Sequence, residues 1–229
     1  MIRVTENLRK IRDLLAKAAV DAGRSAEAVQ LLAVSKKQPF SSIIDAAAAG
    51  QRNFGENQVA EGIEKITTIA DDKLVWHFIG HLQTNKTRAV AEHFDWVHSV
   101  DRLKTARRLS NQRPASLAEL NVCVQVNVDN EPGKSGVTAD DTLDLVNEIL
   151  ELPRLHLRGL MCLPAIRDDF EEQRKPFRKL SRLADRLCAN GIPTDTLSMG
   201  MSADFRAAIF EGSTMVRLGT AIFGARTEK

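Results

Sequence analysis

The chain has 229 residues, of which 43% are hydrophobic and 27% charged, and 32 Lys and Arg against 30 Asp and Glu leave a formal charge of +2. This balance excludes the concentrated basic face of a nucleic-acid-binding protein, and the densest charge run, 168–186, mixes both signs like a solvated helix. The length is enough for one large hydrophobic core, so we expect a single domain over residues 1–229.

The amino terminus is predicted to form an amphipathic helix, because Leu8, Ile11, Leu15 and Ala18 recur at helical spacing among charged residues. It lacks the long apolar stretch of a signal peptide or a membrane span. The odd number and wide spacing of the cysteines favour neither a disulfide framework nor a zinc ribbon. They are Cys123, Cys162 and Cys188. We therefore expect a cytoplasmic protein that does not bind a membrane.

Eight short apolar runs rich in β-branched residues follow this helix and are predicted to be strands. They are 29–35, 53–56, 75–80, 96–100, 121–128, 157–163, 196–199 and 215–219. Helical patterns lie between them at 41–49, 57–70, 83–93, 102–112, 139–150, 168–190 and 202–211, and a short turn covers 221–226. Eight alternating units favour a closed α/β barrel, the (β/α)8 TIM barrel, over an open doubly wound sheet. No GxGxxG motif follows the first strand, which weakens the dinucleotide-binding alternative further.

The first predicted strand ends in two lysines, Lys36 and Lys37. In a TIM barrel the functional side chains lie at the carboxyl ends of the strands. Two lysines at a strand end are usually just solvated, and the alternation of side chains does not decide which of the two points into the barrel. A lysine that attacks an aldehyde must be partly desolvated so that its amine is often neutral, and the mouth of a barrel provides such a position.

The last two predicted strands lead into segments rich in small and hydroxyl residues, TLSMGMS at 196–202 and VRLGTAIFG at 216–224. Barrels commonly hold phosphate in these two loops, where glycine lets backbone N–H groups approach an anion. The alternative is ordinary cap chemistry, with Ser202 as the N-cap of the helix 202–211 and Gly212 as its end. Arg217 lies in an apolar strand and needs a partner, which is either a structural ion pair or a ligand at the barrel mouth.

Three further patterns resemble known sites but each lacks a required residue. The turn 133–135 ends like a P-loop, but Val128 stands where the motif begins with glycine. His77 and His81 are four residues apart without the glutamate or the third ligand of a zinc site, so we expect no metal. Ser198 lacks the upstream glycine of a nucleophile elbow.

Seven segments, in order and over nearly the whole chain, resemble the pyridoxal phosphate homeostasis protein family, also called YggS/PROSC. They are LLAVSKKQP, NFGENQVAEG, WHFIGHLQTNK, the Lys-Ser-Gly turn at 134–136, LRGLMCLPA, TLSMGMS and GSTMVRLGTAIFGAR. The resemblance implies a lone barrel similar to the amino-terminal domain of alanine racemase, the type III fold of pyridoxal 5′-phosphate (PLP) enzymes. It also implies that PLP is carried as a Schiff base on Lys36.

The family pattern further implies where the rest of the cofactor binds. It assigns the phosphate to the 198–202 and 219–220 segments, sets Arg217 against the pyridine nitrogen, and places Asn57 of the FGEN motif beside the cofactor. The expected cofactor-binding residues are Lys36, Asn57, Ser198, Gly200, Ser202, Arg217, Gly219 and Thr220.

The expected function is a carrier role in intracellular PLP (vitamin B6) homeostasis, without amino-acid turnover and with apo forms of PLP enzymes as candidate recipients. An arginine facing the ring nitrogen disfavours its protonation, which makes the cofactor a weaker electron sink. Alanine racemase adds a tyrosine and a second domain, whereas this chain has no Tyr and ends within ten residues of Thr220. Two alternatives stay open: an enzyme of the racemase or decarboxylase kind on the same barrel, and a scaffold without cofactor.

Overall fold

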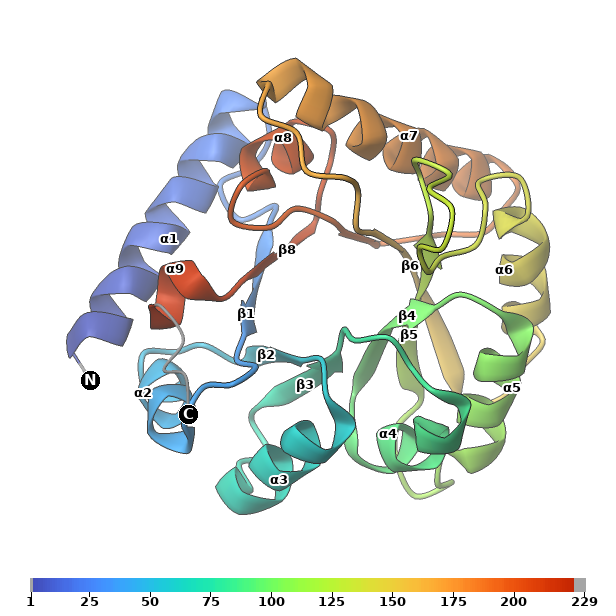
Figure 1. Ribbon diagram of the computed structural model, residues 1–229, viewed down its shortest axis with the longest axis horizontal. Helices are drawn as coiled ribbons and strands as arrows, with labels where there is room; N and C mark the ends of the chain where they lie inside the picture. Colours follow the sequence, from blue (N-terminus) through green and yellow to red (C-terminus); the bar gives the residue numbers. More distant parts are fainter. Residues whose placement is uncertain (1, 225–229) are drawn as a thin grey trace.

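The computed structural model describes residues 2–224, which form a closed barrel of eight parallel strands (Figure 1). The strands are β1 (Gln30–Val34), β2 (Asn53–Glu56), β3 (Val75–Phe78), β4 (Trp96–Val100), β5 (Leu120–Val126), β6 (Leu155–Cys162), β7 (Thr196–Ser198) and β8 (Met215–Leu218). They pair in chain order, and β8 pairs with β1, so the sheet has no free edge. The predicted TIM barrel is confirmed.

The helices form a ring outside the strands (Figure 1). They are α1 (Ile2–Asp21), α2 (Phe40–Ala48), α3 (Val59–Ile69), the 3-10 turn η1 (Thr84–Lys86), α4 (Thr87–His93), α5 (Leu103–Gln112), α6 (Thr142–Leu150), α7 (Phe170–Ala189), α8 (Phe205–Phe210) and α9 (Thr220–Phe223). The predicted amino-terminal helix is α1, whose buried side chains include Leu8 and Leu15 and which packs against α2, α8 and α9. None of the described helices combines the length and apolarity needed to cross a bilayer.

The predicted boundaries differ by a few residues at several helices, and one of them, α8, begins at Phe205 and not at 202. The Asp204 carboxylate accepts the backbone N–H of Met201 at 2.6 Å, so residues 201–204 form a turn ahead of the helix. The predicted helix start at 202 is therefore wrong, and so is the alternative that made Ser202 the N-cap, since Asp204 holds that position. Gly212, with φ +96°, does follow the end of the helix. The predicted turn 221–226 falls partly in α9, and its positions 225 and 226 lie outside the described residues.

Side chains alternate between the outer layer of the barrel and its interior. Val97 on β4 belongs to the large apolar cluster between strands and helices, so its neighbours Trp96 and His98 point inward. A second, smaller cluster inside the barrel joins Trp96 to Cys123 and Met161. The interior therefore combines a few apolar groups with buried polar ones.

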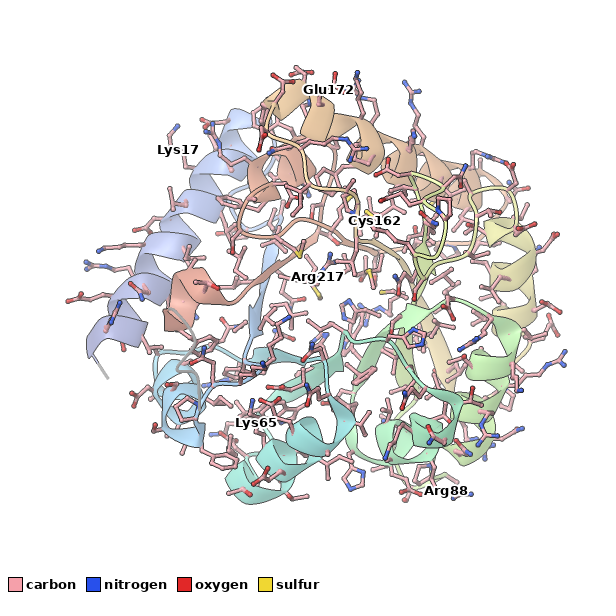
Figure 2. All side chains as sticks on the ribbon, in the orientation of Figure 1. Lys17, Lys65, Arg88, Cys162, Glu172 and Arg217 are labelled. Carbon is pink, nitrogen blue, oxygen red and sulfur yellow. The ribbon has the colours of Figure 1, made fainter. Side chains whose placement is uncertain are left out.

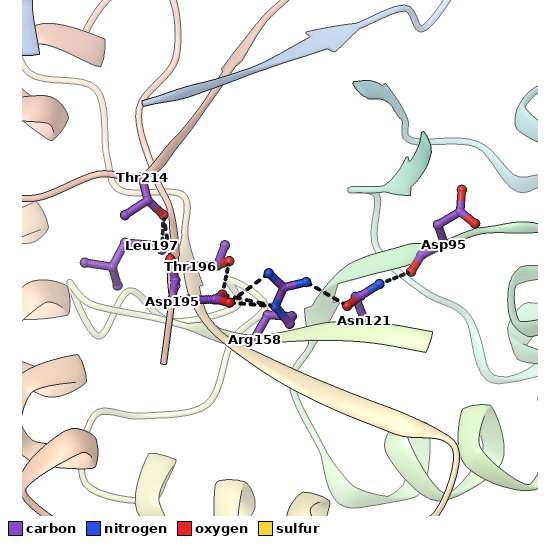
Figure 3. Close-up of polar contacts among 7 residues, drawn as sticks. All are labelled: Asp95, Asn121, Arg158, Asp195, Thr196, Leu197 and Thr214. Atoms are coloured by element: carbon purple, nitrogen blue, oxygen red, sulfur yellow. Dashed lines mark hydrogen bonds and ion pairs between the residues drawn. The ribbon is translucent and has the colours of Figure 1, made fainter. Parts of the chain in front are cut away.

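A polar network ties the strands together at the amino end of the barrel (Figure 3). Arg158 donates to the Asp195 carboxylate at 2.8 Å and to Oδ1 of Asn121 at 2.9 Å, and its guanidinium carbon lies 4.6 Å from the centroid of the Trp96 ring. Asn121 in turn donates to the backbone carbonyl of Asp95 at 3.1 Å. This end of the barrel is thus held by mutual contacts between side chains.

Candidate functional site

The carboxyl ends of the strands surround a cavity of about 870 Å³. Six of the eight residues expected from the sequence line it, although they come from loops far apart in the chain. They are Lys36, Asn57, Ser202, Arg217, Gly219 and Thr220. The remaining two expected residues, Ser198 and Gly200, do not line the cavity.

Lys36 belongs to a turn whose backbone is held by hydrogen bonds from two side chains of α3. The ammonium group of Lys65 on α3 is buried, and it donates to the backbone carbonyl of Ser35 at 2.7 Å and to the Glu61 carboxylate at 2.6 Å. The same Glu61 carboxylate accepts the backbone N–H of Lys37, whose φ is +59°. The backbone on both sides of Lys36 is therefore anchored, so that Lys36 lines the cavity while the exposed Lys37 does not.

Behind this turn lies a buried carboxylate, Glu56, at the end of β2. Its Oε1 accepts from Lys65 at 2.8 Å and from the Ser35 hydroxyl at 2.6 Å, whereas its Oε2 has no hydrogen-bond partner among residues 2–224. Burial raises the pKa of Glu56, and the nearby Lys65 ammonium lowers it in part. Sequence reasoning missed this cluster, because nothing in the pattern of α3 marks Lys65 as an inward-pointing lysine.

Arg217 on β8 is buried, lines the cavity and forms no ion pair within residues 2–224. Its guanidinium NH1 donates to the carbonyl and the hydroxyl of Ser198, and NH2 donates to the backbone carbonyl of Cys162 at 2.8 Å. No carboxylate in the described part of the chain lies within ion-pair distance of this guanidinium. Burial lowers the pKa of Arg217, and the more distant charge of Asp204 opposes this only in part. A buried cation paired only with neutral acceptors favours a ligand at the cavity over the structural ion pair.

Ser198 belongs to a polar chain inside the barrel. Its hydroxyl lies 2.8 Å from Nδ1 of His98, Nε2 of His98 lies 2.9 Å from Nδ1 of His77, and Nε2 of His77 lies 2.9 Å from Oδ1 of Asn53. Ser198 has an exposed fraction of 0%. The Ser198 hydroxyl therefore bonds groups inside the barrel. The sequence had led us to expect it at the phosphate of the cofactor. The inward alternation of β4 is the signal that could have placed His98 here.

Glycines allow close backbone approaches around the cavity. The backbone carbonyl of Gly200 accepts a hydrogen bond from the backbone N–H of Arg217. The φ of Gly200 is +98°, and a Cβ on this residue would lie 2.7 Å from Cβ of Ala208. A Cβ on Gly80 would lie 2.1 Å from the carbonyl oxygen of Asn57. Gly200 thus supports β8 from behind the cavity wall, and Gly80 sets the position of Asn57.

The phosphate donors expected from the sequence differ in availability. The hydroxyls of Ser202 and Thr220 are exposed to the cavity mouth, and neither makes a hydrogen bond with another residue of the 2–224 range. They lie in the loops after β7 and β8, where barrels commonly hold phosphate. The two free hydroxyls and the backbone of Gly219 are therefore the available donors on this side of the cavity.

The rim includes residues that sequence reasoning did not assign to the site. Ser135, in the loop after β5, lies 3.1 Å from Nδ1 of His81, while Ile166 is 86% exposed. His81 is thus at the rim whereas His77 is buried inside the barrel, so the two do not form a common site. Across residues 2–224, no group of three or more His, Cys, Asp or Glu could hold a metal ion.

Comparisons with known proteins find a family model and relatives that match this chain along almost its whole length. The family model for the alanine racemase N-terminal domain matches residues 3–227. A pyridoxal phosphate homeostasis protein of Pseudomonas aeruginosa is 51% identical over 226 residues, which cover 99% of this chain and 97% of the relative. One of Vibrio alginolyticus is 50% identical over 230 residues and 99% of each chain.

A solved structure with the same fold is PipY of Synechococcus elongatus PCC7942 with PLP bound, which is 36% identical to this chain. It superposes with a TM-score of 0.84 over 96% of this chain and 100% of PipY. Because the family model covers nearly the whole chain and the curated relatives match it almost end to end, the chain belongs to the alanine racemase N-terminal domain family and, within it, to the pyridoxal phosphate homeostasis proteins.

Proposed function

We propose that the cavity binds PLP and that the protein serves in PLP homeostasis as a carrier of the cofactor. The observation that carries this proposal is that one cavity of about 870 Å³ gathers three kinds of group: a lysine, a buried guanidinium that forms no ion pair within residues 2–224, and two hydroxyls that bond no residue of that range. The PLP homeostasis relatives and the PipY structure with PLP support it.

The donor set fits the chemical groups of PLP one by one. The cofactor supplies an aldehyde, with which a primary amine condenses reversibly. Lys36 presents such an amine on a turn that Lys65 anchors. Arg217 offers N–H donors to an acceptor such as a ring nitrogen. Ser202 and Thr220 add hydroxyl donors for phosphate oxygens, and a hydrogen bond to a charged group is worth roughly 1.5–3 kcal/mol.

The residues that line the cavity favour a carrier of PLP over an enzyme that converts amino acids. The described lining has no tyrosine to serve as a second acid–base group, because the chain contains no Tyr. Arg217 disfavours protonation of a ring nitrogen beside it, which weakens electron withdrawal from a substrate. Exposed Thr220 and Ile166 leave the mouth accessible to other amines. Apo forms of PLP enzymes are the proposed recipients, and the buried free thiols Cys123 and Cys162 suit the reducing cytoplasm.

The site is tested by the visible absorbance of the purified protein titrated with PLP. We expect a band that Lys36→Ala abolishes and Lys37→Ala leaves in place, because only Lys36 lines the cavity. Borohydride reduction followed by peptide mapping should then find the cofactor on Lys36. Labelling of Lys37 with Lys36 unmodified would show that the site is misplaced.

The carrier role is tested by incubating the PLP-loaded protein with an apo PLP enzyme. We expect recovery of that enzyme's activity at a rate that depends on the loaded protein. Parallel controls follow racemisation and decarboxylation of single amino acids by the loaded protein alone. Robust turnover of one amino acid that is lost in Lys36→Ala would favour the enzyme alternative over the carrier.

A further inference from the structure

The interior of the barrel holds a continuous chain of polar side chains that ends at Arg217. It begins at Asn53 on β2, passes through His77 on β3, His98 on β4 and Ser198 on β7, and reaches Arg217 on β8. Figure 2 places Arg217 and Cys162 within the ring of strands, which is where this chain ends. The successive donor–acceptor distances are 2.9, 2.9, 2.8 and 2.7 Å. Every link is therefore a hydrogen bond of ordinary length.

The direction of this chain is fixed by its two ends. Burial lowers the pKa of His77 to about 3 and that of His98 well below its ordinary value, so each ring is neutral and has one N–H. Oδ1 of Asn53 can only accept, so the proton of His77 is on Nε2. Nδ1 of His77 must then accept from Nε2 of His98. That leaves Nδ1 of His98 to accept the hydroxyl proton of Ser198.

The consequence for Ser198 is that its oxygen presents lone pairs to the Arg217 guanidinium. In the opposite direction, an acceptor nitrogen of His77 would face the acceptor oxygen of Asn53. The hydroxyl proton of Ser198 would also lose the Nδ1 acceptor of His98. NH1 of Arg217 is thus bonded by the hydroxyl and the carbonyl of Ser198, and NH2 by the carbonyl of Cys162. Nε of Arg217 has no acceptor among residues 2–224.

Building on the proposed PLP site, we propose that His98 and Ser198 are positioning residues that hold Arg217 for the ring nitrogen of the cofactor, and that Ser198 therefore acts at the nitrogen end of the ligand and not at its phosphate. Ser198 is fully buried and is absent from the cavity lining, which includes Ser202 and Thr220. A planar guanidinium held at two of its nitrogens keeps one orientation, which a donor to a single ring nitrogen requires.

The test compares PLP with its carbocyclic analogue, in which a CH group replaces the ring nitrogen while the aldehyde and the phosphate remain. Affinities come from absorbance titration of the full chain. The wild-type protein should bind PLP more tightly than the analogue. Ser198→Ala should weaken PLP binding by about tenfold and leave the analogue nearly unchanged, so that the preference for PLP shrinks. The matched control, Thr220→Ala, should weaken both ligands by the same factor and keep the preference.

His98 is tested by replacing its acceptor. His98→Phe keeps an aromatic ring without Nδ1 and should reduce the preference for PLP, as Ser198→Ala does. His98→Asn places an amide oxygen where Nδ1 lies and should restore part of that preference. If the circular dichroism of His98→Phe shows that this variant does not fold, the effect of Ser198→Ala on the preference for PLP decides whether the positioning role holds.

Two results would overturn the positioning role of Ser198, and a third would refute the PLP site on which it rests. Equal weakening of PLP and the analogue by Ser198→Ala would place Ser198 at the phosphate and overturn the positioning role. No effect of Ser198→Ala on either ligand would overturn it as well. A wild-type protein that binds neither ligand would instead refute the proposed PLP site itself.

Discussion

Replacing Lys65 by methionine should lower the free energy of unfolding, because it removes one partner of the buried charge pair behind the Lys36 turn. The Lys65 side chain is 4% exposed, and its ammonium group lies 2.8 Å from Glu56 and 2.6 Å from Glu61 (Figure 2). Methionine fills a similar volume without the charge. In Lys65→Met the Glu56 carboxylate, whose exposed fraction is 0%, keeps the hydroxyl of Ser35 as its one hydrogen-bond partner within residues 2–224.

The magnitude follows from removing one partner of a buried pair, which typically costs about 3–5 kcal/mol. For a chain of this length each kcal/mol lowers Tm by roughly 2–4 °C, so the expected loss is roughly 6–20 °C. A native protein has about 5–15 kcal/mol of stability, so the variant should still fold at room temperature unless the wild type lies at the low end of that range.

The loss should also depend on pH. Burial raises the pKa of Glu56, and Lys65 partly opposes this, so the variant's folded-state pKa should lie further above the unfolded value of about 4.3. A carboxyl with a raised folded-state pKa takes up a proton on folding. Its stabilising contribution is fully present below the unfolded pKa and is lost as pH rises through the folded pKa. Lys65→Met should therefore be less destabilised at pH 5 than at pH 8.

The assay is urea unfolding of wild type and variants at both pH values, followed by circular dichroism. The double variant Lys65→Met/Glu56→Gln should recover much of the lost free energy, because the unpaired buried charge is gone. Lys17→Met is the control, since the Lys17 side chain is 71% exposed in its pair with Asp21 and such pairs contribute about 0–1 kcal/mol. An equal loss at pH 5 and pH 8 without recovery in the double variant would refute the reasoning.

Three shorter predictions concern the cavity and the core. Ser202→Ala and Thr220→Ala should each weaken PLP binding by about tenfold or more in equilibrium titration, and retention of wild-type affinity by both would place the phosphate elsewhere. Gly80→Ala should lower both Tm and PLP affinity, because its Cβ would lie 2.1 Å from the carbonyl oxygen of Asn57; an unchanged variant would contradict that packing. Phe177→Ala removes a fully buried ring and should cost about 3–5 kcal/mol in urea unfolding, and a loss below 1 kcal/mol would be inconsistent with its burial.

The sequence by itself determined the order of the elements, and it predicted the end of the barrel at which the cavity lies. Apolar runs with turn residues at their ends are local signals, and the predicted strands at 53–56 and 96–100 coincide with β2 and β4. The helix start at 202 was wrong because Ser202 and Asp204 are both suitable N-cap residues two positions apart, and residue type does not rank them. In the structure Asp204 accepts the N–H of Met201 and precedes the helix. The prediction of PLP on Lys36 came from resemblance, because alternation alone did not separate it from Lys37.

Only the tertiary structure decided which polar side chains meet inside the barrel. His98 and Ser198 are 100 residues apart, and Arg217 and Cys162 are 55 apart, so no local pattern pairs them. Their contact requires closure of β8 on β1, which brings strands from the whole chain around one small interior. Once the sheet is closed, a buried donor must find an acceptor there, and that requirement turns Ser198 away from the cavity and toward His98 and Arg217.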